Sequence, residues 1–388
     1  MIKIGILTFA FTKDNYGQVL QYLATQEYLR QKGYLATLVE PNGWRTSRWD
    51  RRKKRIKKLF SSIAHRIGLI KAKNGPQLDY SRQTCESELE EQKNVIFKHW
   101  AEVTERKEKE HPRQFEQFRE KYFNRQSGTY NDILSSKYKA FCIGSDQTWS
   151  CAGYHMMLGW VPKKYKRFTI APSVGHRRYT DDEIESLRNY LNKFDFITVR
   201  ENNGIDLCNR CGFTSAKKIL DPTFLLKAKD YEPYVEDVGC EKPYVFVYLL
   251  GGEIEPSVKD IFNLCTSKGY DIKYVESQGR DEGCDCIYAT VGQWLGLIKD
   301  ASYVITNSFH GMAFSIIYHK PYLTIPIIGI LEGMNERIFD LSKQFQLEDR
   351  IYSGNLDALF SPIAWNVADQ CINKNRETLN SLIRNIKL

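Results

Sequence analysis

The sequence predicts an α/β protein built from two Rossmann-like domains. Three observations lead to this fold class. The chain has 388 residues, which is too long for one ordinary domain and suits two. Residues 3–40 read as a strand, a polar loop, a helix and a second strand, the opening unit of a Rossmann-like domain. Residues 302–326 repeat this order, with a sharp loop between strand and helix.

In the opening unit, we expect strands at residues 3–9 and 34–40 and a helix at residues 18–31. The loop between them reads TKDNYGQ, not GxGxxG, so the dinucleotide-binding fingerprint is absent. Its polar side chains follow the carboxyl end of a strand, where they could bind a hydroxyl-rich ligand. The alternative is an ordinary turn with a helix cap. The side chains concerned are those of Asp14, Asn15, Tyr16 and Gln18.

A basic insert, residues 44–125, interrupts the alternation of strands and helices. Residues 45–58 hold nine Lys or Arg against one Asp, and apolar residues at helical spacing follow them. A basic amphipathic helix of this kind favours an anionic membrane surface or a lipid-diphosphate partner. The alternatives are a hairpin that packs on the domain and a nucleic-acid contact, although no recognised nucleic-acid module accompanies the run. Further helices are expected at residues 85–110, which should be exposed, and 115–123.

After the insert, polar residues again follow strand ends. Asp146 and Gln147 come after a strand at residues 138–143, and Arg200 comes after a strand at residues 194–199. A guanidinium at a strand's carboxyl end can bind a carboxylate or phosphate through two parallel hydrogen bonds. The alternative for Arg200 is an ion pair with Glu201 or another acid. A strand at 167–170 and a helix at 181–191, capped by Thr180, complete this region.

The second domain is expected to follow a polar linker. Arg337 stands near the start of one of its helices. The remaining expected elements are helices at 202–211, 291–298, 336–345 and 363–386 and strands at 218–220, 243–250, 271–276, 303–305 and 322–325.

Within residues 302–326, His310 and Gly311 are expected in the loop where a strand passes into a helix. The start of a helix offers free N–H groups and a partial positive charge, both of which suit an anion. Asn307 and Ser308 supply helix-start chemistry, and Gly311 permits close approach to the backbone. His310 titrates near neutral pH. The segment therefore predicts an anion site with an acid/base group beside it; the alternative is a structural histidine that caps the helix.

Composition narrows the class of protein. Hydrophobic residues make up 42% of the chain and charged residues 27%, as in soluble globular proteins, and the net charge of +9 favours an anionic partner. No run of residues is long and apolar enough to span a bilayer, and the first residues read as a strand rather than a signal peptide, so we expect a cytoplasmic location. The ten cysteines should be free thiols, because the CxxC at Cys208 and Cys211 and the CxC at Cys284 and Cys286 match no common zinc module.

Several short motifs occur together in one order. After KIGILTFAFTKDNYGQVLQ they are GSDQTW at 144–149, APSVG at 171–175, TVRE at 198–201, DPTFLL at 221–226 and ITNSFHG at 305–311. In this order the motifs resemble the polysaccharide pyruvyl transferase family over most of the chain. The resemblance implies two domains that face each other across a cleft, as in GT-B enzymes: residues 1–200 on the acceptor side and residues 201–388 on the donor side.

The resemblance also implies an activity. The donor would be phosphoenolpyruvate, a co-substrate that needs no further cofactor or metal, and the acceptor a hydroxyl pair of a sugar. The product would be a cyclic pyruvate ketal on a surface or capsular polysaccharide or on its lipid-diphosphate-linked precursor. Such a protein would work in the cytoplasm, and at the inner face of the cell membrane residues 45–58 would contact anionic lipid. No nucleic acid is expected as a partner.

One departure concerns residues 308–310. Some family members carry Arg-Leu-His where this chain has Ser-Phe-His, so Arg200, Arg337 or a lysine would have to supply the missing charge. We expect His310 and Arg200 to be catalytic. Donor-binding residues would be Asn307, Ser308, Gly311 and Arg337; acceptor-binding residues would be Asp14, Asn15, Gln18, Asp146 and Gln147. The alternatives are a GT-B glycosyltransferase that uses a nucleotide sugar and a non-catalytic binding protein at the membrane surface.

Overall fold

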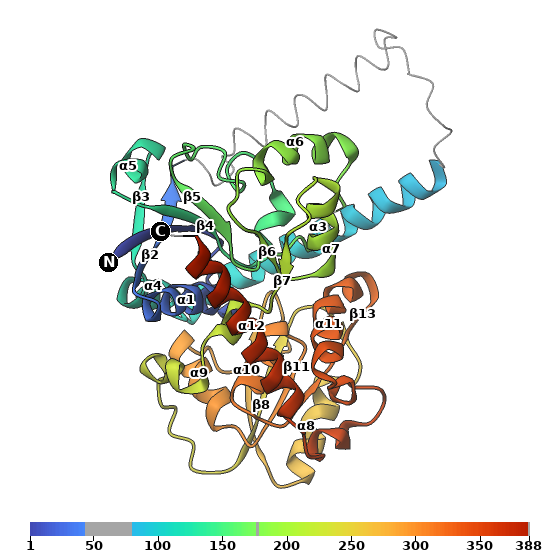
Figure 1. Ribbon diagram of the computed structural model, residues 1–388. Coiled ribbons are helices and arrows are strands. Elements are labelled where there is room, and N and C mark those ends of the chain that lie inside the picture. Colours follow the sequence, from blue (N-terminus) through green and yellow to red (C-terminus); the bar gives the residue numbers. More distant parts are fainter. Residues whose placement is uncertain (43–79, 176–177, 387–388) are drawn as a thin grey trace.

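The computed structural model describes residues 1–42, 80–175 and 178–386. The first domain contains a five-stranded parallel sheet in the order β3-β2-β1-β4-β5, which matches the first five strands of the Rossmann fold (Figure 1). Apolar side chains fill β1 and β4 because a parallel sheet is covered on both faces. The strands are β1 (Ile2–Leu7), β2 (Tyr34–Pro41), β3 (Arg125–Gly128), β4 (Ala140–Ile143) and β5 (Lys166–Thr169).

The second domain contains a four-stranded parallel sheet in the order β10-β8-β11-β12. The two sheets confirm the predicted fold class, two Rossmann-like domains in a GT-B-like arrangement. Figure 1 shows the two domains one above the other. The strands are β8 (Tyr244–Leu250), β10 (Asp271–Ser277), β11 (Tyr303–Thr306) and β12 (Tyr322–Thr324), and a two-stranded antiparallel pair joins β9 (Glu253–Ile254) to β13 (Ile327–Ile328).

The helices of the first domain and of the insert agree with most of the sequence predictions. Thr180 caps α6 as expected, through a reciprocal capping box with Glu183. The basic segment, residues 45–58, lies outside the described residues. The helices are α1 (Tyr16–Gln31), α3 (Tyr80–Glu110), α4 (Phe115–Tyr122), α5 (Tyr130–Ser135), α6 (Asp181–Leu191) and α7 (Asn202–Arg210).

Helix α3 is mostly exposed over its described side chains, as expected, but one side of its last turns packs against the second domain. Val103 and Lys107 are buried there, and Lys107 forms an ion pair with Glu276 at the end of β10. The charge-rich composition predicted an exposed helix. The ion pair could not be predicted, because a contact between distant segments leaves no local pattern in the sequence.

The helices of the second domain are α8 (Val258–Ser267), α9 (Val291–Asp300), α10 (Phe309–Ile317), α11 (Glu336–Phe345) and α12 (Asn366–Asn385). The prediction that His310 and Gly311 lie in a loop is wrong. Both lie in the first turn of α10, because the side chain of Ser308 accepts a hydrogen bond from the Gly311 N–H and starts the helix earlier.

Short strands β6 (Thr198–Val199) and β7 (Lys217–Lys218) connect the two sheets. The strand expected at residues 194–199 is reduced to β6, although Phe196 still pairs with Phe168 of the first sheet. Arg200 follows β6 directly, as predicted. The expected domain boundary at residue 200 falls in this connecting region and remains a prediction.

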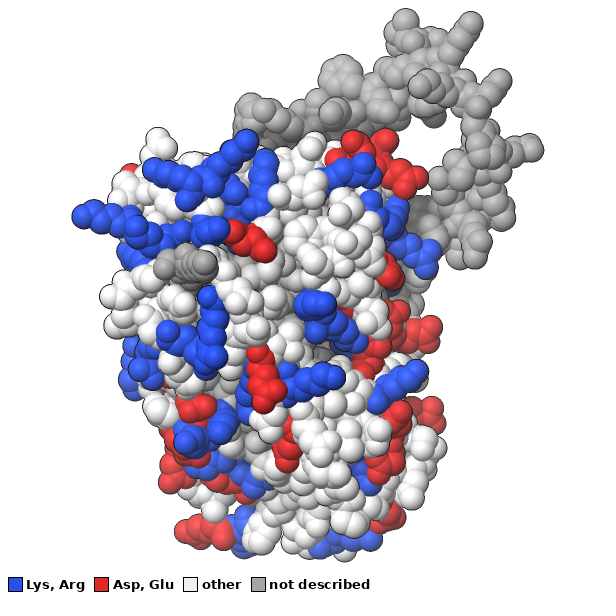
Figure 2. Space-filling model, in the orientation of Figure 1, with Lys and Arg blue, Asp and Glu red and all other residues white. Residues whose placement is uncertain are grey.

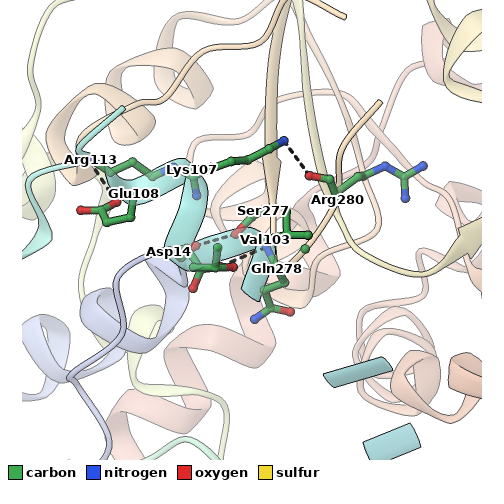
Figure 3. A pocket seen from close by; sticks show the side chains of 10 residues that line it. Asp14, Val103, Lys107, Glu108, Arg113, Ser277, Gln278 and Arg280 are labelled. Carbon is green, nitrogen blue, oxygen red and sulfur yellow. Dashed lines mark hydrogen bonds between the residues drawn. The ribbon is translucent and has the colours of Figure 1, made fainter. Parts of the chain in front are cut away.

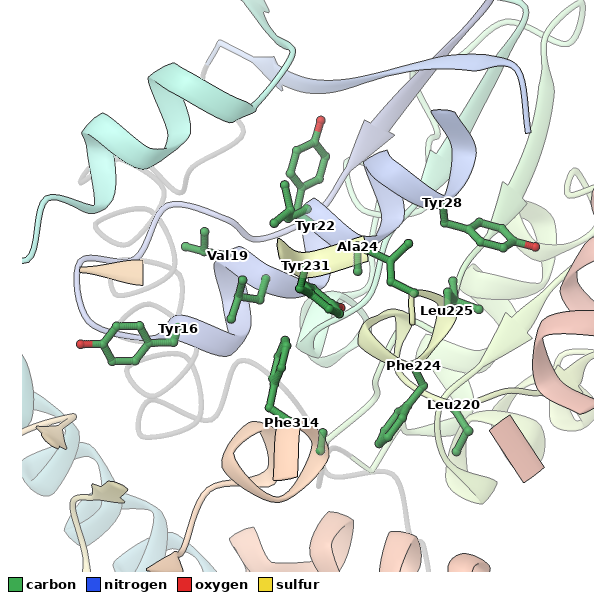
Figure 4. Close-up of a cluster of buried hydrophobic side chains, with 14 of the residues drawn as sticks. Tyr16, Val19, Tyr22, Ala24, Tyr28, Leu220, Phe224, Leu225, Tyr231 and Phe314 are labelled. Carbon is green, nitrogen blue, oxygen red and sulfur yellow. The ribbon is translucent and has the colours of Figure 1, made fainter. Parts of the chain in front are cut away.

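One hydrophobic cluster runs through both domains. The ring of Tyr16 stacks on Trp294 with 5.3 Å between centroids, and its hydroxyl donates to the Ala289 carbonyl. Figure 4 shows Tyr16 and Val19 of α1 in the same cluster as Phe314 of α10 and Tyr231. Because α1 and α10 pack in one core, the loops at their N-terminal ends are held close together.

Helix α12 also ties the domains to each other. It returns from the second domain toward the first (Figure 1), and Tyr28 of α1 donates a hydrogen bond to Asn380. Arg376 donates to the carbonyls of Phe224 and Leu226, just after β7. None of the described helices is long and apolar enough to cross a membrane.

The charges are not evenly distributed. On the face in Figure 2, Lys and Arg predominate over the first domain, whereas Asp and Glu are more frequent over the second. The described cysteines of the CxxC and CxC motifs are free thiols, and both members of the CxxC are buried. Among the residues with described positions, no cluster of three or more His, Cys, Asp or Glu could hold a metal ion.

Candidate functional site

Arg200 is the centre of a buried ionic cluster at the carboxyl end of β6. Its Nε lies 3.0 Å from Oε1 of Glu201, and its Nη1 donates to Oδ2 of Asp221 at 2.9 Å. Burial alone would lower the pKa of Arg200, but the carboxylates of Glu201 and Asp221 raise it above its usual range, so the side chain is firmly cationic. Its Nη2 is buried and has no hydrogen-bond partner among the described residues. One guanidinium nitrogen therefore remains available to a ligand.

His310 lies beside this ion pair. Its Nε2 is 3.7 Å from Oδ2 of Asp221, an ion-pair distance that is too long for a hydrogen bond. Within the described part of the chain this buried Nε2 has no hydrogen-bond partner. Burial would raise the pKa of Asp221, but His310 and Arg200 lower it well below its usual range, so Asp221 is a carboxylate. The unpartnered Nε2 thus lies next to a buried negative charge.

The other edge of the His310 ring faces Gly17 in the first turn of α1. A Cβ on Gly17 would lie 1.9 Å from Nδ1 of His310, so no larger residue fits there unless the imidazole moves. The glycine of the Asn-Tyr-Gly sequence at the start of α1 therefore permits a close contact between helices of the two domains. Glycine at this position fixes where the histidine lies.

Arg337 brings a second guanidinium to the same place. It comes from the first turn of α11, and its Cζ lies 5.8 Å from the ring centroid of Phe309, while Cζ of Arg200 lies 5.3 Å from the same ring. Burial and the charge of Arg200 lower the pKa of Arg337. Its buried Nε has no hydrogen-bond partner in the described residues. Two like charges beside one ring repel each other, and an anionic ligand would relieve that repulsion.

Both arginines line one pocket, which we call the inner pocket, and His310 lies next to Asp221 in its wall. Lys218 adds a third cation to its wall. The inner pocket is lined by Arg200, Glu201, Lys218, Leu220, Asp221, Phe309, Arg337, Asp340, Leu341 and Gln344.

Loops of the first domain reach this cluster. Gln18 donates from Nε2 to Oδ2 of Asp146 at 3.0 Å, and the charge of Asp146 contributes to raising the pKa of Arg200. The backbone of Asp146 has φ 66° and ψ −173°, a conformation that is strained for a residue other than glycine and that concentrates at functional sites. Gln147 is half-buried beside Gly175. Gln18 and Asp146 thus lie near the cationic cluster, and their contact with the acceptor remains a prediction.

Asp14 and Asn15 are placed differently. Figure 3 shows Asp14 in a separate pocket, with its carboxylate bound to the N–H of Gln278 and its carbonyl accepting from Ser277. The hydroxyl of Thr104 donates to the same carboxylate. Asn15 accepts a hydrogen bond from the Gln18 N–H and caps α1. Both side chains are therefore engaged within the protein and away from the inner pocket.

Three predicted donor-binding residues build the start of α10. The buried amide of Asn307 accepts from the N–H of Leu250 and donates to its carbonyl, which joins the ends of β11 and β8. Ser308 is the N-cap. A Cβ on Gly311 would lie 2.3 Å from Oγ1 of Thr306, so the close approach at this glycine is to the protein itself. Their contacts orient His310, and a direct donor contact by these three remains a prediction.

Sequence reasoning missed three members of the cluster. Asp221, Gly17 and Phe309 stood inside the recognised motifs but were given no role, whereas the ion pair of Arg200 with Glu201 was the stated alternative and is confirmed. Asp221 could have been noticed because an acid that follows a short strand is placed like Arg200 and Asp146. Phe309 gave no such signal, because its role depends on the two guanidinium groups that the fold brings to its ring.

The fold and the site together define a class. The chain is a two-domain α/β protein with a pocket that Arg200 and Arg337 line, next to a buried histidine. The sequence model of the polysaccharide pyruvyl transferase family matches residues 15–327, and the chain belongs to that family. No curated protein shows significant sequence similarity to the chain.

Several solved structures have a similar course of the chain. A UDP-GlcNAc 2-epimerase from Methanocaldococcus jannaschii is 11% identical with a TM-score of 0.48, and the match covers 97% of this chain and 94% of that one. S. aureus MnaA, in a co-structure with UDP, is 12% identical with a TM-score of 0.43, over 96% and 88% of the two chains. The glycosyltransferase SsfS6 from Streptomyces sp. SF2575 is 9% identical with a TM-score of 0.37, over 99% and 96%.

Proposed function

We propose that this protein transfers the pyruvyl group of phosphoenolpyruvate to two hydroxyls of a sugar and forms a cyclic ketal. The observation that carries the proposal is the pair of guanidinium groups at Phe309, each with a buried nitrogen that lacks a partner among the described residues, next to His310. Phosphoenolpyruvate carries a carboxylate and a phosphate, and guanidinium groups bind both through charge-assisted hydrogen bonds.

Arg337 takes the place of the arginine that some relatives carry at the position of Ser308. It reaches the ring of Phe309 from α11 instead of from the start of α10. Family membership supports a polysaccharide sugar as the acceptor, and its lipid-diphosphate-linked precursor is the form we propose. The predicted contact of residues 45–58 with anionic lipid would bring the enzyme to that precursor.

The reaction needs a proton at C3 of phosphoenolpyruvate and two new bonds at C2. We assign the proton to Nε2 of His310, which lies 3.7 Å from the carboxylate of Asp221. Two hydroxyl oxygens bond to C2, and the bond from C2 to the phosphate oxygen breaks. Of the two hydroxyl protons, one goes to His310 and replaces the proton that His310 gave to C3. The other leaves with phosphate. A positioned acid of this kind typically contributes about 10²–10⁴-fold to the rate.

The experiment measures phosphate release from phosphoenolpyruvate in the presence of lipid-linked or free oligosaccharide, together with the mass of the product. We expect a product heavier by a pyruvate ketal and a fall of about 10²–10⁴-fold in His310→Ala. His319→Ala is the matched control, because His319 is half-exposed and pairs with Asp369 on the surface. Turnover of His310→Ala near that of wild type would exclude His310 as the acid. A nucleotide sugar as the donor would identify a glycosyltransferase instead.

A further inference from the structure

A second hollow adjoins the inner pocket, and we call it the outer pocket. The two share Glu201, Arg337 and Asp340 in their walls. The outer pocket lies between the start of α7 and the first turns of α11, and it is the larger, with a volume of about 330 Å³ against about 20 Å³. Sites for small molecules typically measure about 300–1,000 Å³. Its further lining residues are Gly175, Asn202, Asn203, Glu336 and Phe339.

The chemistry of the outer pocket differs from that of the inner one. Arg337 is the cation shared by the two, and the remaining polar groups of the outer wall are amides and carboxylates. Asn203 is fixed by a hydrogen bond from its Nδ2 to the Gly175 carbonyl at 2.6 Å. Phe339 exposes 43% of its surface. Amide and carboxylate groups beside an exposed aromatic ring suit a neutral ligand with many hydroxyls, whereas three carboxylates disfavour a second anion.

Glu201 stands at the junction of the two pockets. It is 9% exposed, and its Oε1 is held by Arg200. Its Oε2 is buried without a hydrogen-bond partner in the described ranges. A buried carboxylate oxygen without a partner is destabilising because its lost hydration is not replaced, so a donor from a ligand would stabilise it. Because Glu201 lines both pockets, that donor would lie at the boundary between them.

We infer that the outer pocket binds the sugar ring of the acceptor and that Oε2 of Glu201 accepts the proton of its first reacting hydroxyl. This inference rests on the proposed function and gives it a second site. The hydroxyl O–H bond breaks, its proton passes to Oε2, and its oxygen bonds to C2 of the pyruvyl group in the inner pocket. The carboxyl of Glu201 later returns the proton to the departing phosphate. Phe339 packs against the apolar face of the ring.

The binding part is tested by saturation-transfer NMR with the methyl glycosides of galactose, glucose, mannose and N-acetylglucosamine. We expect transfer from wild type to at least one glycoside and a loss of at least fivefold in Phe339→Ala. Phe97→Ala is the matched control, since Phe97 is 44% exposed and lies on α3, outside both pockets. No transfer from wild type, or an undiminished signal from Phe339→Ala, would overturn the outer pocket as the sugar site.

The chemical part is tested with Glu201→Gln, which keeps the size and a hydrogen-bonding oxygen but cannot take the proton. Phosphate release with the best-bound glycoside should fall about 10²–10⁴-fold, while glycoside transfer and stabilisation by phosphoenolpyruvate stay within a few-fold of wild type. An equal fall in phosphoenolpyruvate binding would show that Glu201 is only the counterion of Arg200. Release near the wild-type rate, or no release by wild type with a glycoside it binds, would also contradict the role.

The two proposals fail separately. If phosphoenolpyruvate does not stabilise the wild-type protein, the donor assignment is wrong, whereas the glycoside signal and its loss in Phe339→Ala would still establish the outer pocket. If phosphoenolpyruvate binds and no glycoside does, the pyruvyl donor site stands and the acceptor site proposed here falls.

Discussion

Asp221 and Arg200 form a buried ion pair in which Oδ2 of Asp221 accepts from Nη1 of Arg200 at 2.9 Å. The carboxylate fixes one side of the guanidinium and Glu201 fixes its Nε, so the remaining Nη2 has a defined direction. The same Oδ2 lies 3.7 Å from His310. A single acid therefore positions both the cation that we assign to the donor and the group that we assign to proton transfer.

Replacement of Asp221 should therefore be costly for folding. Removing one partner of a buried ion pair typically costs about 3–5 kcal/mol, because the other charge is left uncompensated. We expect Asp221→Ala to lose about this much unfolding free energy in urea, measured at pH 7. Asp195→Ala is the control, since Asp195 pairs with Lys166 at a partly exposed site. A loss below about 1 kcal/mol, the usual limit for exposed pairs, would contradict the account.

Acid should lower the unfolding free energy of the protein, because it protonates the carboxyl of Asp221. The folded-state pKa of Asp221 lies below its unfolded value of about 3.9, so the unfolded chain takes up the proton first. The contribution of Asp221 to stability is complete above about pH 4 and declines as the pH falls toward the folded-state pKa. Urea unfolding of wild type and Asp221→Asn between pH 5 and pH 2 should show their difference shrinking. A difference that grows on acidification would reverse the assigned sign.

Gly17→Ala tests the contact between α1 and His310. The added methyl would overlap the imidazole, so the ring must leave its present position beside Asp221. Overpacking of this kind typically costs about 1–3 kcal/mol of stability, and we expect turnover to fall more than 100-fold if His310 delivers the proton. Gly153→Ala is the control, because a Cβ at Gly153 meets no atom within 4 Å. Equal activity of the two variants would show that the position of His310 is unimportant.

Arg337→Gln should weaken donor binding without weakening the fold, because the charge that it removes is repelled by Arg200. A hydrogen bond to a charged group contributes about 1.5–3 kcal/mol, which corresponds to a roughly 10- to 150-fold weaker Kd for phosphoenolpyruvate. Loss of the repulsion from Arg200 should leave the unfolding free energy unchanged or slightly raised. Calorimetric titration and urea unfolding measure the two effects. Unaltered affinity would show that Arg337 does not replace the arginine missing at position 308.

Asp14 should affect stability rather than the acceptor. Its carboxylate holds Thr104 of α3 and the N–H of Gln278, so Asp14→Ala should destabilise the contact between the domains. We expect a lower Tm with the KM for acceptor unchanged. A raised KM at unchanged Tm would support the acceptor role expected from the sequence.

The sequence located strand ends well because short apolar runs followed by polar residues are a local signal. Arg200, Asp146 and Gln18 were found in this way, and the structure brings them together near His310. The same rule could not separate Gln18 from Asp14, because the partners of Asp14 lie 90 and 264 positions away in the chain. Nor could it show that Arg337 of α11 reaches the ring of Phe309, since that contact depends on how α10 and α11 pack.

The central claim is that phosphoenolpyruvate binds in the inner pocket. Thermal stabilisation by phosphoenolpyruvate, compared with a panel of nucleotide sugars on wild type, His310→Ala and Arg337→Gln, tests it most directly. Ligand at about 100 times its Kd adds about 2.7 kcal/mol of stability. The account predicts a clear shift with phosphoenolpyruvate alone, reduced in both variants. A shift with nucleotide sugars only, or a phosphoenolpyruvate shift that both variants retain in full, would contradict it.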